Sequence, residues 1–318
     1  MSSSSNFPAA ESPAPIASSM LMRRSTVALM FAIALAGAAG LVAWGPVSLV
    51  PHMHQFADTR VIWGAPYGAN VWSHLPLVPI GLWGLWRVSR LPRGESLRWV
   101  WGWFFCCQML ATVGGMVYHW APSDLTFVWD QVPRSSACAL FAAAFLAERI
   151  DRRFGHPVAI AVALGAALAG GGWWLLSLHA WGQGDLRPLI WLELTPIALV
   201  ATGAWTLHGH LLSRQDWMRS QLSFVVAQTV DWGDKPIYEW TNHVISGHSL
   251  RHLALAACVG WVAYRLGSGY SQGARSQAAS GHDKGHPQVP FVPHLPDLEP
   301  PQAAAVSVTS FPDKRLAS

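Results

Sequence analysis

The sequence predicts an all-α protein, a bundle of helices that crosses a lipid bilayer several times. Its 318 residues are 52% hydrophobic and only 12% charged, whereas a soluble domain carries about 25% charged residues. Tryptophan, with 19 residues, is apolar with one N–H donor and is enriched where a membrane meets water. Long apolar runs exclude a soluble protein whose core is merely rich in tryptophan.

The apolar runs set the predicted order of the elements. Residues 1–24, rich in Ser, Ala and Pro, should be a disordered tail. The run at 25–50 follows two arginines and is long enough to span, either as a signal anchor or as a cleaved signal peptide. Further runs lie at about 70–88, 98–119, 127–147, 156–179, 187–210, 217–231 and 240–264. Residues 267–318, rich in Gly, Pro and Ser, should be a second disordered tail.

The distribution of basic residues predicts the orientation of these spans. If all eight runs cross the membrane from a cytoplasmic N-terminus, 16 of the 21 lysines and arginines lie on the cytoplasmic side. Four then lie in the outer loops, and Arg251 lies within the last span. Cytoplasmic loops of membrane proteins carry such an excess of basic residues. Without the short run at 217–231, the basic C-terminal tail would lie outside, so the charges favour that span.

Two other classes of function find no support in the sequence. The net charge of +4 resides in tails and loops, and no motif combines aromatic and basic residues for binding bases, so we expect no nucleic-acid partner. Cys106, Cys107, Cys138 and Cys258 lie in apolar runs without a CxxC spacing. This pattern favours small buried side chains over a disulfide framework or a cysteine zinc site.

Three histidines and one aspartate fall at the same predicted membrane depth, toward the outer side. His248 and His252 are four residues apart, so they share one face of a helix and can bind one metal ion together. His119, near the end of another span, would leave a tetrahedral zinc with one open position, as in catalytic sites. Asp130 opens the next span. From spacing alone, His119 could equally be an interfacial histidine and Asp130 a helix N-cap.

Four short motifs, in this order and spacing, carry a resemblance to a known family. They are Asn70-Val71-Trp72-Ser73-His74-Leu75, Tyr118-His119 with Asp130, Asp231-Trp232-Gly233-Asp234-Lys235-Pro236-Ile237-Tyr238, and Ser246-Gly247-His248 through His252. Together they resemble the alkaline ceramidases, a family of membrane hydrolases, over about Asn70 to Ala257. The first motif is similar to the family's Asn-x-x-Ser-Asn-Leu, and the third to the segment before the closing HxxxH motif of bacterial members.

The resemblance implies a fold, a cofactor and an activity. Residues 70–266 would be the seven-helix domain of the family, and the run at 25–50 would be an additional span. His119, His248 and His252 would bind Zn²⁺, and Asp130 would be catalytic, carrying a proton between water and the leaving amine. The substrate would be a ceramide-like lipid with an acyl chain, cleaved at its amide bond. The protein would lie in a bacterial inner membrane, with both termini in the cytoplasm; the sequence does not indicate an oligomeric state.

This sequence departs from the family pattern in two places. The family's serine, four residues before the first histidine, is replaced by Gly115, which we place with Tyr118 on the substrate side of the site. Thr112 lies on a similar face, and we expect Gly115→Ser to leave activity unchanged or raise it. The missing hydroxyl favours the alternative of a metal-binding relative with impaired catalysis, receptor-like or structural. The family's acidic calcium site has only Asp58 as a counterpart, so we predict no calcium.

Overall fold

Helices form the regular structure of residues 16–50 and 52–282, which are the residues that the computed structural model describes; no β-strand occurs among them. The prediction of an all-α protein is therefore confirmed. In chain order the helices are α1 (Ile16–Trp44), α2 (Gly68–Trp72), α3 (Leu77–Ser89), α4 (Leu97–Trp120), α5 (Asp124–Arg149), the 3₁₀ turn η1 (Arg152–Gly155), α6 (Pro157–Trp181), α7 (Arg187–Gly203), α8 (Arg214–Trp232), α9 (Asp234–Trp240) and α10 (Gly247–His282).

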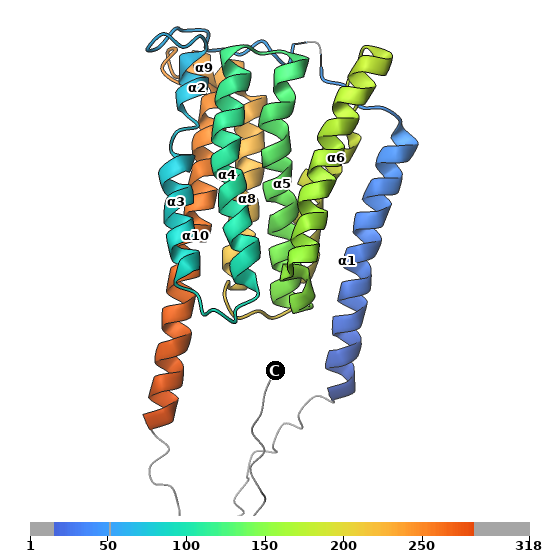
Figure 1. Ribbon diagram of the computed structural model, residues 1–318, viewed down its shortest axis with the longest axis vertical. Helices are drawn as coiled ribbons and strands as arrows, with labels where there is room; N and C mark the ends of the chain where they lie inside the picture. Colours follow the sequence, from blue (N-terminus) through green and yellow to red (C-terminus); the bar gives the residue numbers. More distant parts are fainter. Residues whose placement is uncertain (1–15, 51, 283–318) are drawn as a thin grey trace, which may run out of the picture. The chain divides into compact units, whose positions relative to one another are not determined.

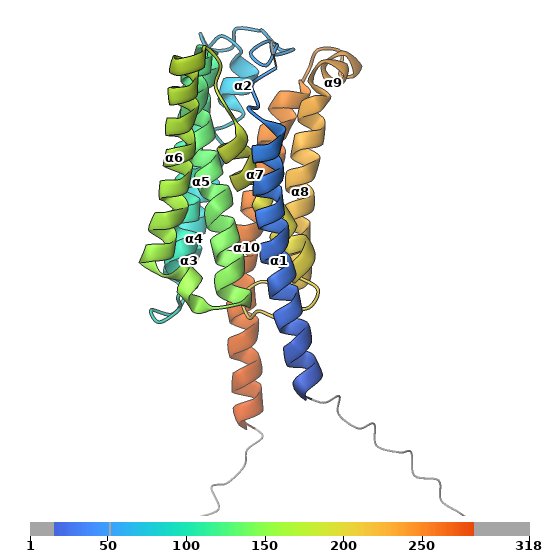
Figure 2. The ribbon, with the colours of Figure 1, turned by 90° about the vertical axis from the view of Figure 1, so that its right-hand side faces the viewer.

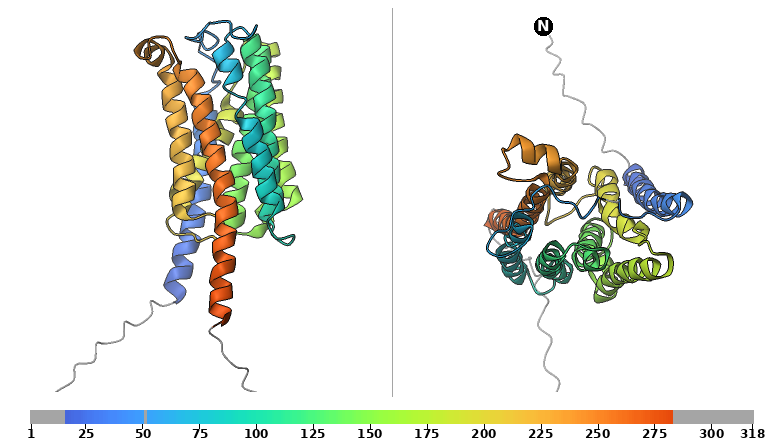
Figure 3. Two further views of the ribbon diagram at one scale, coloured as in Figure 1. Left: turned by 90° about the vertical axis from the view of Figure 1, so that its left-hand side faces the viewer. Right: turned by 90° about the horizontal axis from the view of Figure 1, so that it is seen from above.

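The long helices of the unit that ends at Ser276 lie side by side with nearly parallel axes (Figures 1 and 2). Helix α4 packs against α3 and α5, and α5 also packs against α6 and α7. Helix α1 contacts α7 and lies at the edge of the group, as the view from above shows (Figure 3). The short helices α2 and α9 lie at one end of the unit, which is also the end where α4 finishes (Figure 1).

Three helices among the described residues are long and apolar enough to cross a membrane: Met20–Trp44, Leu97–Trp120 and Pro157–Trp181. Exposed tryptophans lie within about two turns of helix ends, as expected of side chains at the two membrane–water interfaces. One group is Trp44, Trp120, Trp129, Trp181 and Trp232, and the other is Trp83, Trp86, Trp99, Trp103 and Trp205. These features support a membrane protein. That seven spans lie within residues 70–266 stays a prediction.

Several predicted boundaries move. Helix α1 begins at Ile16, so residues 16–24 of the predicted tail are helical, and residues 1–15 lie outside the described part. Helix α10 continues to His282, so residues 267–282 of the second predicted tail are helical. Residues 283–318 lie outside the described part of the chain. The run at 70–88 is divided by a turn at 73–76, because Pro76 has no N–H to continue α2. That turn carries Ser73 and His74.

A close approach of α4 and α5 fixes the position of the site. A Cβ atom on Gly114 would lie 1.8 Å from the backbone oxygen of Trp129, so only glycine allows the two helices to approach this closely here. Ser123 begins α5 with a capping box, accepting from the Thr126 N–H. This turn and the contact at Gly114 hold the C-terminal part of α4 against the turn of α5 that carries Asp130.

Candidate metal centre

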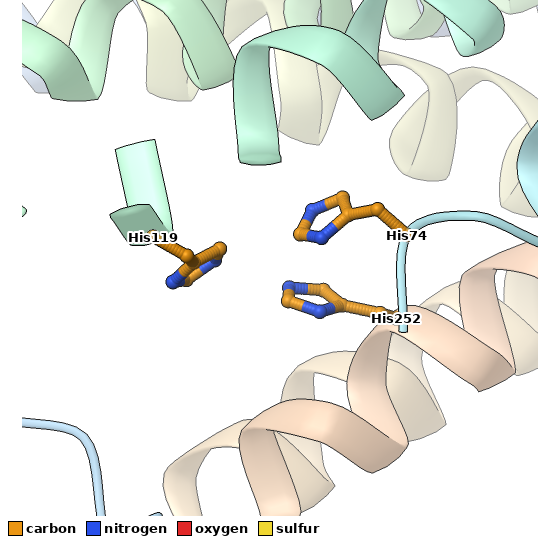
Figure 4. A group of neighbouring side chains, drawn as sticks. All are labelled: His74, His119 and His252. Atoms are coloured by element: carbon orange, nitrogen blue, oxygen red, sulfur yellow. The ribbon is translucent and has the colours of Figure 1, made fainter. Parts of the chain in front are cut away.

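Three buried histidines converge at the end of the bundle where α2 and α9 lie. His74 comes from the turn before α3, His119 from the last turn of α4 and His252 from the second turn of α10 (Figure 4). One ring nitrogen of each lies within 4.8 Å of the others. Their exposed fractions are 4%, 1% and 4%. A cluster of imidazoles so far from solvent fits a metal ion, because nitrogen donors at this spacing can reach one centre.

His248 stands beside this group. Its Nε2 lies 3.2 Å from Nε2 of His119, and its ring centroid lies 4.7 Å from that of His252. The predicted set of His119, His248 and His252 is thus brought together in space, but the three histidines that meet the mutual distance of 4.8 Å include His74 in place of His248. The assignment of His248 as a ligand stays a prediction.

Hydrogen bonds fix which nitrogen of His74 and His252 faces the cluster. Nδ1 of His74 donates to the carbonyl oxygen of Asn70 at 2.9 Å, so its Nε2 carries a lone pair. Nδ1 of His252 lies 2.8 Å from Oγ of Ser73. Since that hydroxyl already donates to the Asn70 oxygen at 2.9 Å, it accepts from His252, whose Nε2 is then also a free acceptor. A metal-binding histidine is typically held in this way by its second nitrogen.

His248 is oriented by the aspartates of the segment at 231–238. Its Nδ1 donates to Oδ1 of Asp231 at 2.5 Å, and its backbone N–H donates to Oδ1 of Asp234 at 2.8 Å. The second oxygen of Asp231 pairs with Arg251 at 3.3 Å. His248 therefore also presents an Nε2 lone pair. Nδ1 of His119 is buried and has no hydrogen-bond partner among the described residues. Several inward lone pairs and one unpartnered nitrogen suit a cation.

Asp130 lies in a buried network of charges. Its Oδ2 accepts from Nη1 of Arg134 at 2.9 Å, and Nε of Arg134 lies 3.2 Å from Oε1 of Glu193 on α7. Asp130 is not the N-cap of α5, which is Ser123. That alternative is therefore excluded, because the helix begins at Asp124, six residues before Asp130.

A cavity connects the histidines with these charges. It encloses about 800 Å³ of empty space including its opening, and His74, His252, Asp130, Arg134 and Glu193 line it. The rest of its wall is mostly apolar. The lining includes Phe104, Phe141, Phe224 and Leu255. Along α5 it runs from Asp130 to Phe141, which is about 16 Å at 1.5 Å per residue. A mostly apolar lining with a few polar groups is typical of small-molecule sites.

Neither predicted substrate-side residue lines this cavity. The hydroxyl of Tyr118 lies 2.9 Å from Nδ1 of His54 in the segment before α2, and its ring packs on Phe127. A Cβ atom on Gly115 would lie 2.1 Å from Nε2 of His74. The expectation that Gly115→Ser leaves activity unchanged or raises it assumed open space at position 115; that assumption was wrong, because the space holds an imidazole, and the effect on activity stays a prediction. The hydroxyl of Thr112 donates to backbone oxygens of His74 and Gln108.

The segment before α2 packs against two of the histidines. The ring of Phe56 lies 4.7 Å from that of His119 and 4.6 Å from that of His248. The N–H of Ala57 donates to Asp234, the first residue of α9, which fastens this segment to the start of that helix. Burial raises the pKa of Asp58, but hydrogen bonds from Arg60 outweigh that effect and lower it. The carboxylate of Asp58, the counterpart considered for a calcium site, is thus already paired with Arg60.

His74 is the residue of this site that the sequence analysis missed. A signal was present, since histidine stands where the resembling motif has asparagine. It was not connected with Gly115, because the two are about forty residues apart. No protein-family model, curated protein or solved structure matches the chain.

Proposed function

We propose that this protein is a metal-dependent membrane hydrolase that cleaves an amide bond in a ceramide-like lipid. One observation carries the proposal: buried histidines with inward-facing Nε2 lone pairs stand at the wall of a largely apolar cavity that also contains Asp130. A metal beside a pocket for an apolar chain is an arrangement suited to hydrolysis of a lipid. The resemblance in motifs to alkaline ceramidases supports the choice of an amide.

Zinc is the proposed ion. The donors are imidazoles without cysteine, which suit zinc, although copper, iron and nickel bind the same donors. His119 and His252 belong both to the predicted ligand set and to the group of histidines that lie within 4.8 Å of one another. His74 and His248 are the two further candidate ligands. When bound, such an ion supplies a Lewis acid and lowers the pKa of a water molecule to near 7.

The residues of the chain supply the remaining steps. Asp130 accepts a proton from the attacking water and returns it to the leaving amine, which is general acid–base catalysis. Arg134 holds that carboxylate in place through the hydrogen bond of 2.9 Å. The apolar wall of the cavity receives the acyl chain, and each buried CH₂ contributes about 0.8 kcal/mol to binding.

We further propose that α1 and seven spans between 68 and 276 cross the bilayer, with α2 and α3 together forming one of them. The α3–α4 connection with Arg90 and Arg93, the α5–α6 connection with Arg152 and Arg153, and the start of α8 at Arg214 lie at the end opposite the histidines (Figure 1). The positive-inside rule makes that end cytoplasmic and places the metal centre toward the outer side. The proposed location is a bacterial inner membrane.

The test is hydrolysis by purified protein in detergent. Ceramides of several chain lengths are offered, and release of fatty acid is measured before chelation, after chelation and after return of Zn²⁺. We expect activity that is lost with the metal and restored by it. Activity that resists complete removal of metal would refute the proposal. A protein that binds one ion but cleaves no acyl amide would instead be the non-catalytic relative, which the pairing of Asp130 with Arg134 favours.

A further inference from the structure

We propose that His74 and Gly115 are a coupled pair, in which the missing side chain at position 115 makes room for a fourth imidazole at the metal centre. The inference rests on the proposed metal site. It adds His74 as a ligand to the predicted set of His119, His248 and His252.

Gly115 and the ring of His74 compete for one volume. A Cβ atom on residue 115 would lie 2.1 Å from Nε2, 2.5 Å from Cδ2 and 2.8 Å from Cε1 of His74. Carbon atoms do not approach other heavy atoms that closely without bonding. Any side chain at position 115 therefore excludes the His74 ring from its present position.

The glycine next to it in α4 has a different reason to be glycine. At Gly114 an added Cβ would meet the backbone of α5, so that residue serves the packing of two helices. At Gly115 the three nearest atoms all belong to the imidazole of His74. Gly102, in the same helix, has nothing within 4 Å of an added Cβ. The requirement at position 115 is thus specific to one side chain.

His74 is held in the orientation of a ligand. Its Nδ1 is engaged by the Asn70 carbonyl, and its backbone oxygen accepts from Thr112. Its ring centroid lies 3.7 Å from that of His252 and 5.3 Å from that of His119. The turn at 73–76 that carries His74 also provides Ser73 as the partner of His252, so one turn orients two of the rings.

The pair changes the coordination available to the ion. With His119, His248 and His252, His74 brings the number of imidazoles to four, and five of the six ring pairs lie within 5.3 Å. Four imidazoles fill a tetrahedral ion, so a water ligand requires a fifth position. Zinc accepts such a position, which the catalytic cycle of zinc enzymes also uses.

A double-mutant cycle with Co²⁺ as the probe tests the pair. Purified wild type, His74→Ala, Gly115→Ala and the double variant are titrated with Co²⁺, and the visible d–d spectrum and the dissociation constant are measured. Five-coordinate Co²⁺ absorbs more weakly than tetrahedral Co²⁺. We expect a weak spectrum in wild type, and a stronger one with at least about tenfold weaker binding in both single variants.

The coupling is the decisive quantity. Because alanine at 115 acts by displacing His74, Gly115→Ala should have no further effect in the His74→Ala background. Gly102→Ala is the matched control and should behave as wild type. If Gly115→Ala prevents folding, the double variant should restore a monodisperse protein that binds Co²⁺ like His74→Ala.

The outcomes separate the two proposals. Failure of wild type to bind Co²⁺ or Zn²⁺ would refute the metal site itself. Normal binding with an unchanged spectrum and affinity in His74→Ala would overturn the coupled pair and leave a three-histidine site standing. Additive effects of the two substitutions would also overturn it, since residue 115 would then act on something other than His74.

Discussion

Removing the hydroxyl of Ser73 tests whether the hydrogen bonds behind the histidines serve metal binding. This hydroxyl accepts from Nδ1 of His252 at 2.8 Å and donates to the Asn70 oxygen at 2.9 Å. In Ser73→Ala the Nδ1–H of His252, a side chain that is only 4% exposed, loses its acceptor. Loss of such an outer partner typically weakens metal binding by about 10- to 100-fold. The expected change is therefore about 1.4–2.7 kcal/mol in the free energy of binding.

The assay is competition for Zn²⁺ between the purified protein and a chromophoric chelator of known affinity. Ser136→Ala is the matched control, because Ser136 is buried but donates only to the Val132 oxygen of its own helix. We expect that control to bind Zn²⁺ like wild type. Equal affinity in Ser73→Ala and wild type would refute the reasoning. An equal loss in Ser136→Ala would show that the effect is one of general stability.

Three further predictions concern catalysis, stability and topology. Asp130→Asn should keep its metal but lower amide hydrolysis by at least about 100-fold, because the proton carrier is lost; undiminished turnover would refute its role. Burial raises the pKa of Asp185, but hydrogen bonds from Arg187 and Trp173 outweigh it and lower the pKa to about 2. Since this folded pKa is below the ordinary value of 3.8 for an aspartate, the stabilisation by Asp185 is complete above about pH 4 and is lost as the pH falls toward 2. Asp185→Asn should thus lower the melting temperature in detergent at pH 7, with a gap that narrows below pH 4; a gap independent of pH would contradict this. Reporter fusions after Arg153 should indicate cytoplasm and those near Gln183 the opposite side; a shared location would refute the topology.

The helical class and the membrane character could be predicted because they depend on local properties of the chain. Apolar runs such as 98–119 and 156–179 reappear as α4 and α6 with ends shifted by one or two residues. The start of the run at 240–264 was predicted less accurately, because α10 begins at Gly247 and the residues directly before it form turns. Those turns place Asp231 and Asp234 against His248, a long-range arrangement that hydrophobicity does not encode.

The composition of the site could be predicted in part. His248 and His252 are linked by helical spacing, and His119 by its position at the end of a span. His74 could not be found in this way, because its position depends on the turn between α2 and α3 and on the absence of a side chain at Gly115. The charge network around Asp130 could not be predicted either, because Glu193 contacts Arg134 from a helix about sixty residues further along the chain.

The measurement that tests the central claim most directly is the metal content of the purified protein. Wild type, His119→Ala and His252→Ala would be prepared without added metal and analysed by mass spectrometry for zinc and other transition metals. His156→Ala, which changes an exposed histidine before α6, is the control. We predict about one zinc per chain in wild type and control, and loss of most of it in the other two variants. Equal metal content in all four proteins would contradict the metal centre.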